Sequence, residues 1–287
     1  MSDTLTTTTS AVFIPELWIN PVIKATESRL VLADKVMRLD AEAKKYGDIL
    51  HLPNVSNLTA NDKTQGSEVT LNQVTETDNS VTIDTWKECS FEIEDIVKTQ
   101  SKYDLRSLYT QKAGYALAKA IDTSLASLYS SLTTTDVGDY GVDIDDATVL
   151  AAIQTLHEND ADEEDRCFVI KPSQMIAIMK LDKFVKADSR GDMGNFSPVV
   201  AGVKKPGYWG DIYGDPVYYT NQVQTTAGTP TQTHNLYFHK EAFALALQLA
   251  PRVQGQNWLK DLAFLVVMDT LYGVNVIRAD HGVELRS

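Results

Sequence analysis

The sequence is poor in cysteine and has no long apolar run. Its two cysteines, Cys89 and Cys167, form no Cys-x-x-Cys pair, which excludes a disulfide framework and disfavours a zinc or redox site. The longest apolar stretch, residues 262–268, has the length of a strand and not of a bilayer span, so we expect no membrane association. The first ten residues have neither the basic nor the apolar region of a signal peptide. We therefore expect a protein that is made and used in a cytoplasm.

Clustered positive charge is also lacking. The 287 residues include 39 acidic and 26 basic side chains, for a net charge of −13. The two basic doublets, Lys44-Lys45 and Lys204-Lys205, are too few to grip a phosphate backbone, so sequence-specific DNA binding is excluded. An acidic chain can nevertheless form a surface that lies beside nucleic acid without binding it tightly.

No catalytic template is present. The sequence has no Gly-x-Ser-x-Gly, His-Glu-x-x-His or phosphate-binding-loop motif, and its five histidines are scattered. The acidic stretches 136–146 and 160–165 lack the glycine turn and distal glutamate of a calcium-binding loop. We expect no catalytic residue, no metal ligand and no cofactor.

Residues 54–100 have the pattern of strands that cannot form a core alone. A polar, turn-rich segment, residues 57–66, opens this region. Apolar residues then recur in pairs spaced by two: Val69 and Leu71, Val81 and Ile83, Phe91 and Ile93. Period two is typical of strands with one covered face, and Asp78-Asn79 could form the bend of a hairpin. Because such a hairpin has few large apolar residues, we expect it to lie against something else, in this chain or a neighbour.

A long amphipathic helix is predicted over residues 103–132. Its apolar residues repeat at helical spacing without a gap, and thirty residues would extend about 45 Å. The middle of the helix, residues 113–120, is built of small side chains that allow another backbone to approach, so we expect Ala116 to be a packing contact. The length of the helix predicts an elongated subunit.

The remaining sequence is mixed and ends in strands. Helix and strand patterns alternate after residue 146, and residues 186–210 form a long loop without periodicity. The predicted late strands are residues 236–238, 243–249, 262–268, 272–277 and 283–285. A sheet formed by these strands on the long helix would be discontinuous in sequence. The fold class is therefore α+β.

Seven short segments of the chain carry distinctive local motifs. They are 13–18 (FIPELW), 47–53 (GDILHLP), 58–62 (LTAND), 95–101 (DIVKTQS), 113–118 (AGYALA), 239–243 (HKEAF) and 271–278 (LYGVNVIR). Ile121-Asp122 adds a further motif within the long helix. In this order, the motifs resemble those of a family of tailed-bacteriophage major capsid proteins with the Hong Kong 97 type fold.

The resemblance implies a division of the chain and a set of partners. It implies an N-terminal arm (1–50), an extended β-hairpin loop (51–94), a peripheral domain with the spine helix (95–146), an axial domain (147–235) and closing strands of both domains (236–287). The implied protein self-assembles in the host cell cytoplasm, as hexamers and pentamers, into the icosahedral virion capsid around double-stranded DNA that it contacts without sequence specificity. A separate scaffolding protein and a portal are further implied partners, with a cement protein as an option, because the sequence has no long extra helical segment to serve as a built-in scaffold.

Under this interpretation seven residues are candidate inter-subunit contacts. They are Phe13, Trp18, Leu58, Asp62, Lys63, Trp86 and Ala116. Some capsids of this fold join a loop lysine to a neighbour's asparagine, and Lys63 with Asn257 or Asn275 offers the residue types, yet the polar loop beside Asp62 predicts no cross-link. Two alternatives stay open: a nanocompartment shell of the same fold that encloses cargo enzymes, and, more distantly, an unrecognised enzyme.

Overall fold

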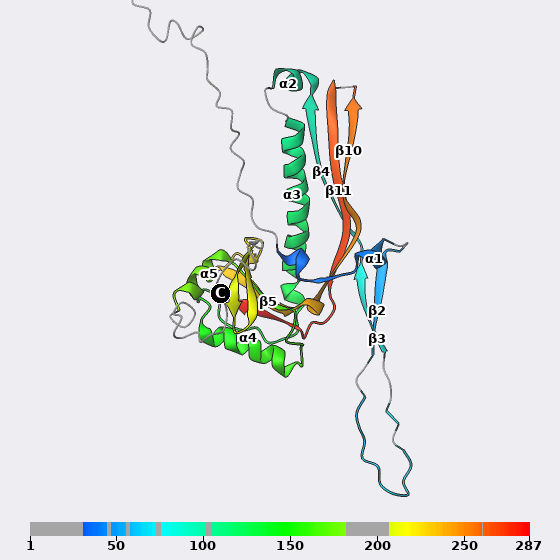
Figure 1. The fold of residues 1–287 in the computed structure, drawn as a ribbon, viewed down its shortest axis with the longest axis vertical. Helices are drawn as coiled ribbons and strands as arrows, with labels where there is room; N and C mark the ends of the chain where they lie inside the picture. The colour runs from blue at the N-terminus through cyan, green and yellow to red at the C-terminus, as the bar shows by residue number, and fades with distance from the viewer. Residues whose placement is uncertain are drawn as a thin grey trace, which may run out of the picture.

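The computed structural model shows an elongated subunit with three parts (Figure 1). A long helix and a long sheet rise side by side from a compact α/β part, and a hairpin extends in the opposite direction. The described residues are 31–44, 47–55, 58–69, 71–72, 76–101, 105–181, 207–259 and 261–287. The candidate contacts Phe13 and Trp18, and most of the loop predicted over 186–210, lie outside them.

The long sheet has the strand order β1-β10-β11-β4. Its strands are β1 (Met37–Arg38), β4 (Thr85–Glu94), β10 (Phe243–Trp258) and β11 (Ala263–Val276). Antiparallel pairing joins β10 to β11 from Phe243↔Val276 to Trp258↔Ala263, and β4 pairs antiparallel with β11 on the other side. β4 is separated in sequence from β10 by the long helix and most of the compact part, so the sheet is discontinuous, as predicted.

The spine helix packs on this sheet. α3 (Leu105–Ala126) continues into the 3-10 helix η3 (Ser127–Ser131), which confirms the helix predicted over 103–132 within a few residues. Ala113 and Leu117 face the sheet and pack with Met268 of β11. Ala116 is exposed, so the expectation that it packs within the subunit is wrong. A run of small residues has no large side chain to mark the buried face of the helix. The helical spacing of Ala113 and Leu117 marks that face.

The hairpin is longer than the sequence indicated. β2 (Ile49–Val55) pairs antiparallel with β3 (Glu76–Thr82), from Ile49↔Thr82 to Val55↔Glu76. The bend predicted at Asp78-Asn79 is therefore wrong, because both residues lie within β3 and the chain turns farther out. Both polar side chains have partners in the folded subunit instead. Asp78 pairs with His51 at 2.5 Å, and the Asn79 amide donates to the Ile277 carbonyl at 3.0 Å.

The base of the hairpin, unlike its outer end, belongs to the subunit's own core. Val81 and Ile83 are buried against Ala244 and Ala246 of β10. α1 (Asp40–Ala43), which precedes β2 in the chain, packs on β10. α2 (Asp95–Gln100) follows β4 at the opposite end of the long sheet (Figure 1). The expectation that the hairpin has too few apolar residues to form a core of its own thus applies only to the part beyond this base.

The compact part is built on a six-stranded sheet in the order β12-β9-β5-β7-β6, with β8 on β9. Its elements are α4 (Asp146–Glu158), β5 (Arg166–Ile170), α5 (Pro172–Met179), β6 (Tyr208–Ile212), β7 (Asp215–Tyr219), β8 (Gln224–Thr226), β9 (Gln232–His239), η4 (Lys240–Ala242) and β12 (Gly282–Arg286). Phe168 and Tyr237 stack at 4.0 Å in its core. Tyr213 and Gly214, both at positive φ, form the tight turn between β6 and β7.

The last strands connect the compact part to the long sheet. β9 passes through η4 into β10, and β11 returns to β12, so the late strands alternate between the two sheets. The domain boundaries inferred from the resemblance stay predictions. None of the described helices is long and apolar enough to cross a membrane.

Candidate assembly surfaces

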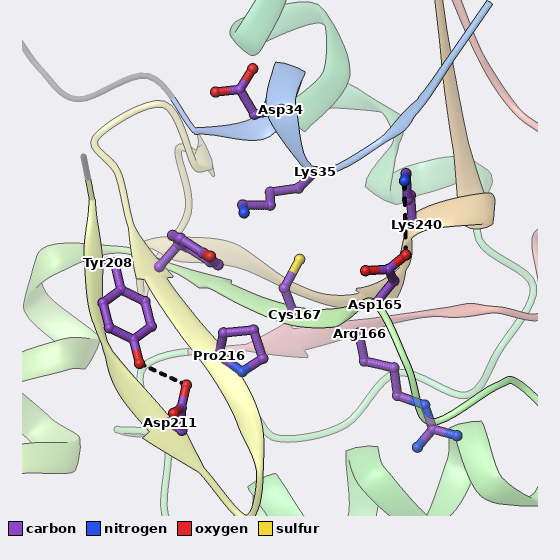
Figure 2. A pocket seen from close by; sticks show the side chains of 10 residues that line it. Asp34, Lys35, Asp165, Arg166, Cys167, Tyr208, Asp211, Pro216 and Lys240 are labelled. Carbon is purple, nitrogen blue, oxygen red and sulfur yellow. Dashed lines mark hydrogen bonds and ion pairs between the residues drawn. The ribbon is translucent and has the colours of Figure 1, made fainter. Parts of the chain in front are cut away.

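One pocket is lined by the compact part together with Asp34 and Lys35, and its side chains make structural contacts (Figure 2). Lys240 pairs with Asp165 at 3.8 Å, and the Tyr208 hydroxyl donates to Asp211 at 2.8 Å. Arg166 extends away from Cys167 in Figure 2, and its Nε donates to the Asp162 carbonyl at 2.6 Å. These charges serve to hold the pocket walls together.

The thiol in this pocket is not an activated nucleophile. Cys167 is fully buried, and burial raises its pKa to about 12, so it stays protonated at neutral pH. Among the described residues no group of three or more His, Cys, Asp or Glu side chains is placed to hold a metal ion. The features that point to a function lie instead on the outer surfaces.

The first surface is the hairpin tip, residues 58–69 and 71–72. Leu58, Val69 and Leu71 are 66%, 73% and 89% exposed there, far from any core cluster. The tip is shaped by local bonds: the Asn61 amide donates to Asn72 Oδ1 at 2.8 Å, and Ser67 Oγ donates to the Thr64 carbonyl at 2.8 Å. Apolar side chains held out on a polar frame are typical of a surface that a partner covers.

Asp62 and Lys63 lie on this tip beside Leu58. The Lys63 ammonium donates to the Ser67 carbonyl, and both residues are exposed. Of the two candidate asparagines, Asn275 donates to the Ser80 carbonyl at 2.6 Å, while Asn257 is exposed on β10. Lys63 is therefore an exposed side chain whose amine donates to a backbone carbonyl of its own loop.

The second surface is the side chain of Trp86, which is 69% exposed on the edge strand β4. Its Nε1 donates to Asp269 Oδ2 at 3.1 Å, while Arg252 donates to the same carboxylate from Nε at 2.8 Å and from a terminal nitrogen at 2.9 Å. Hydrogen bonds from Arg252 first, then from Trp86, lower the pKa of Asp269. The bonds fix one edge of the indole and leave the ring open to a partner.

A third surface, at the far end of the long sheet, escaped sequence reasoning. Ile96 of α2 is 65% exposed, and Leu259 and Leu262, at the turn between β10 and β11, are 84% and 66% exposed. The Asp95 amide donates to the Leu262 carbonyl at 3.0 Å, so α2 and this turn form one distal end (Figure 1). The available signal was two leucines flanking a polar hairpin turn, where apolar residues have no local core to enter.

Ala113 and Ala116 separate packing within the subunit from contacts outside it. We expect Ala113→Trp to lower the free energy of unfolding by roughly 1–3 kcal/mol, because the indole would overpack the contact with Leu117 and Met268. Ala116→Trp, on the exposed face of α3, should change it by less than about 0.5 kcal/mol. Urea unfolding of both variants measures this difference, and equal destabilisation would show that the helix faces are wrongly assigned.

The sequence candidates that the structure describes lie in two regions. Leu58, Asp62 and Lys63 lie together on the hairpin tip, whereas Trp86 and Ala116 belong to the unit of long sheet and spine helix.

Comparison with known proteins gives one consistent picture. The sequence profile of a family described as phage capsid protein matches residues 34–286. No curated protein matches the chain.

Solved capsid structures share its fold. A structure from Mycobacterium phage Che8 is 24% identical, with a TM-score of 0.78 over 95% of this chain and 97% of that one. The capsid of the cyanophage P-SCSP1u is 16% identical, with a TM-score of 0.76 over 99% and 96%. The mature capsid of bacteriophage PhiM1 is 14% identical, with a TM-score of 0.72 over 95% and 91%.

Proposed function

Because this chain belongs to the phage capsid protein family, as a major capsid protein of the Hong Kong 97 type that forms the phage head shell, we propose how its subunits join. Its copies group into hexamers and pentamers, and each hairpin tip lies on an adjacent subunit. The observation that carries this proposal is the exposure of Leu58, Val69 and Leu71 at the end of a hairpin whose base is buried in its own subunit.

The apolar tip can supply useful contact energy. Fully burying one leucine or valine side chain contributes about 1.5–3 kcal/mol, so the three tip residues offer each interface a substantial part of its affinity. A tip that meets a different surface on its neighbour is a head-to-tail contact, and such contacts form a ring when the rotation between neighbours closes. Trp86, Ala116 and the distal end around Leu259 are the surfaces that we assign to further contacts between copies.

Asp62 and Lys63 would give the tip contact its polar rim, and Phe13 and Trp18 of the predicted arm would add anchors on other neighbours. A separate scaffolding protein, a portal and an optional cement protein complete the assembly in the host cytoplasm. The net charge of −13 supports packaged double-stranded DNA that is enclosed without sequence-specific binding. The protein acts without catalysis, which the protonated Cys167 and the paired charges of its pocket support.

Particles purified from infected or co-expressing cells test this function. We expect electron micrographs to show closed icosahedral shells, and mature particles to protect double-stranded DNA from nuclease. Shells that enclose enzymes and no DNA would favour a nanocompartment instead. A subunit that remains monomeric beside its scaffolding protein would contradict assembly.

The shell should be free of covalent links between subunits. Lys63 is exposed and bound to a carbonyl, and the Asn275 amide is held by Ser80, so neither is placed for isopeptide formation. Mature particles boiled in detergent and reducing agent should run as one band near 31.8 kDa. A ladder of multimers that Lys63→Arg abolishes would contradict this expectation, and Lys87→Arg serves as the matched control.

A further inference from the structure

Asp122 is a buried carboxylate that holds a distant segment of backbone. It is 1% exposed near the end of α3, and it accepts hydrogen bonds from three consecutive N–H groups. Its Oδ2 lies 2.7 Å from the nitrogen of Val31 and 3.3 Å from that of Leu32, and its Oδ1 lies 3.0 Å from that of Ala33. Asp122 and Val31 are 91 positions apart, so these bonds are tertiary contacts.

Burial and a neighbouring carboxylate make these hydrogen bonds necessary to Asp122. Burial raises the pKa of Asp122, the three N–H groups lower it, and the nearby carboxylate of Asp34 raises it. A buried carboxylate is costly unless it is hydrogen-bonded, and the first N–H groups of η2 (Leu32–Asp34) have no acceptor within so short a helix. The carboxylate therefore gives these N–H groups their hydrogen-bond acceptor, and the N–H groups offset the cost of burying the carboxylate.

The segment that Asp122 binds, residues 31–39, is here called the strap. Val31, Leu32 and Val36 of the strap are buried in the main core cluster. Its Lys35 ammonium lies 4.2 Å from the ring centroid of Tyr218 in β7, and its Leu39 amide donates to the Leu245 carbonyl of β10 at 2.9 Å. The strap thus contacts the spine helix, the compact part and the long sheet, and it directly follows the residues predicted to form most of the arm.

We propose that Asp122 is the positioning residue of the arm: its carboxylate seats the strap on α3 and so fixes the point from which the rest of the arm, residues 1–30, extends. Shell assembly needs this seat, because an arm that starts from a loose strap reaches its neighbours at a greater entropic cost. The inference rests on the proposed function, in which the arm extends along neighbouring subunits.

Asp122→Asn is the discriminating variant. It keeps the shape of the side chain but replaces one oxygen with an NH₂ group, which cannot accept a bond. If NH₂ replaces Oδ2, Val31 and Leu32 lose their acceptor, and if it replaces Oδ1, Ala33 does. Asp34→Asn is the charge-matched control on the exposed side of the strap, and Leu125→Ala destabilises the same helix without touching the carboxylate.

Hydrogen exchange of the soluble subunit tests the seat. In Asp122→Asn we expect strap amides to exchange roughly ten- to a hundredfold faster, because hydrogen bonds to a charged group are lost, while amides of β9 keep their protection. Asp34→Asn should leave the exchange rates of the strap amides unchanged. Strap exchange that rises no more than that of β9 would overturn the proposal.

Particle yield tests the link to assembly. Asp122→Asn should form at least about tenfold fewer closed shells than Leu125→Ala compared at equal folded fraction. If Asp122→Asn loosens the strap yet forms shells at the wild-type yield, assembly does not need the seat and the proposal fails. A wild-type chain that forms no shells contradicts the proposed function instead, while the exchange comparison still decides the seat.

Discussion

Replacing residues 56–75 with a two-residue Asn-Gly turn should give a folded subunit that forms no closed shells. The replacement joins Val55 to Glu76, which already lie opposite each other in the hairpin, and Asn-Gly favours the tight turn that such strands need. Val81 and Ile83 stay in their core cluster, so the thermal midpoint should change little. The exposed apolar tip is lost, and with it the proposed contact to the neighbour.

Size-exclusion chromatography and electron microscopy measure the outcome. Leu58→Ser with Leu71→Ser, which keeps the full hairpin but removes its largest apolar side chains, should lower shell yield in the same direction. Normal shells from the shortened hairpin would contradict the assignment of the tip as an assembly surface. Loss of the folded subunit would mean that the tip contributes to the core.

Gly273→Ala should lower the free energy of unfolding by about 3 kcal/mol, the upper end of the usual cost of overpacking. Gly273 lies in β11 where the end of β3 crosses it. A Cβ there would overlap the carbonyl oxygen of Thr82 and would lie 3.0 Å from Cα of Ile83, and these backbone atoms cannot rotate away. The substitution therefore separates the base of the hairpin from the long sheet.

Gly114→Ala is the matched control for this variant. A Cβ at Gly114 of α3 meets only Met268 Cε, at an ordinary 3.6 Å, and alanine is favoured over glycine in a helix by about 1 kcal/mol. We expect Gly114→Ala to be neutral or stabilising in urea unfolding. A Gly273→Ala subunit as stable as the wild type would show that β3 does not cross β11 as described.

Much of the fold could be predicted because the spacing of apolar residues along the chain indicates which positions are buried. The alternation from Phe243 onward identified β10, and helical spacing identified α3. The bend at Asp78-Asn79 was misplaced because turn-forming residues were favoured over a strand whose polar groups pair across the hairpin and with Ile277. Polar residues predict turns only where no partner from another part of the chain satisfies them.

The candidate site was only partly predictable. Leu58 was found through the 58–62 motif that resembles the capsid family, but the distal leucines Leu259 and Leu262 resembled ordinary core residues until the structure showed them exposed. Asp122 was noticed only as part of a family motif. Its role depends on the N–H groups of residues 31–33, and one sequence carries no signal for a contact between segments so far apart.

A cryo-electron reconstruction of assembled particles tests the central claim most directly, because it shows where each hairpin tip lies. The account predicts a closed icosahedral shell of hexamers and pentamers in which Leu58, Val69 and Leu71 are buried on an adjacent subunit. A closed shell in which these three side chains remain in solvent would contradict it.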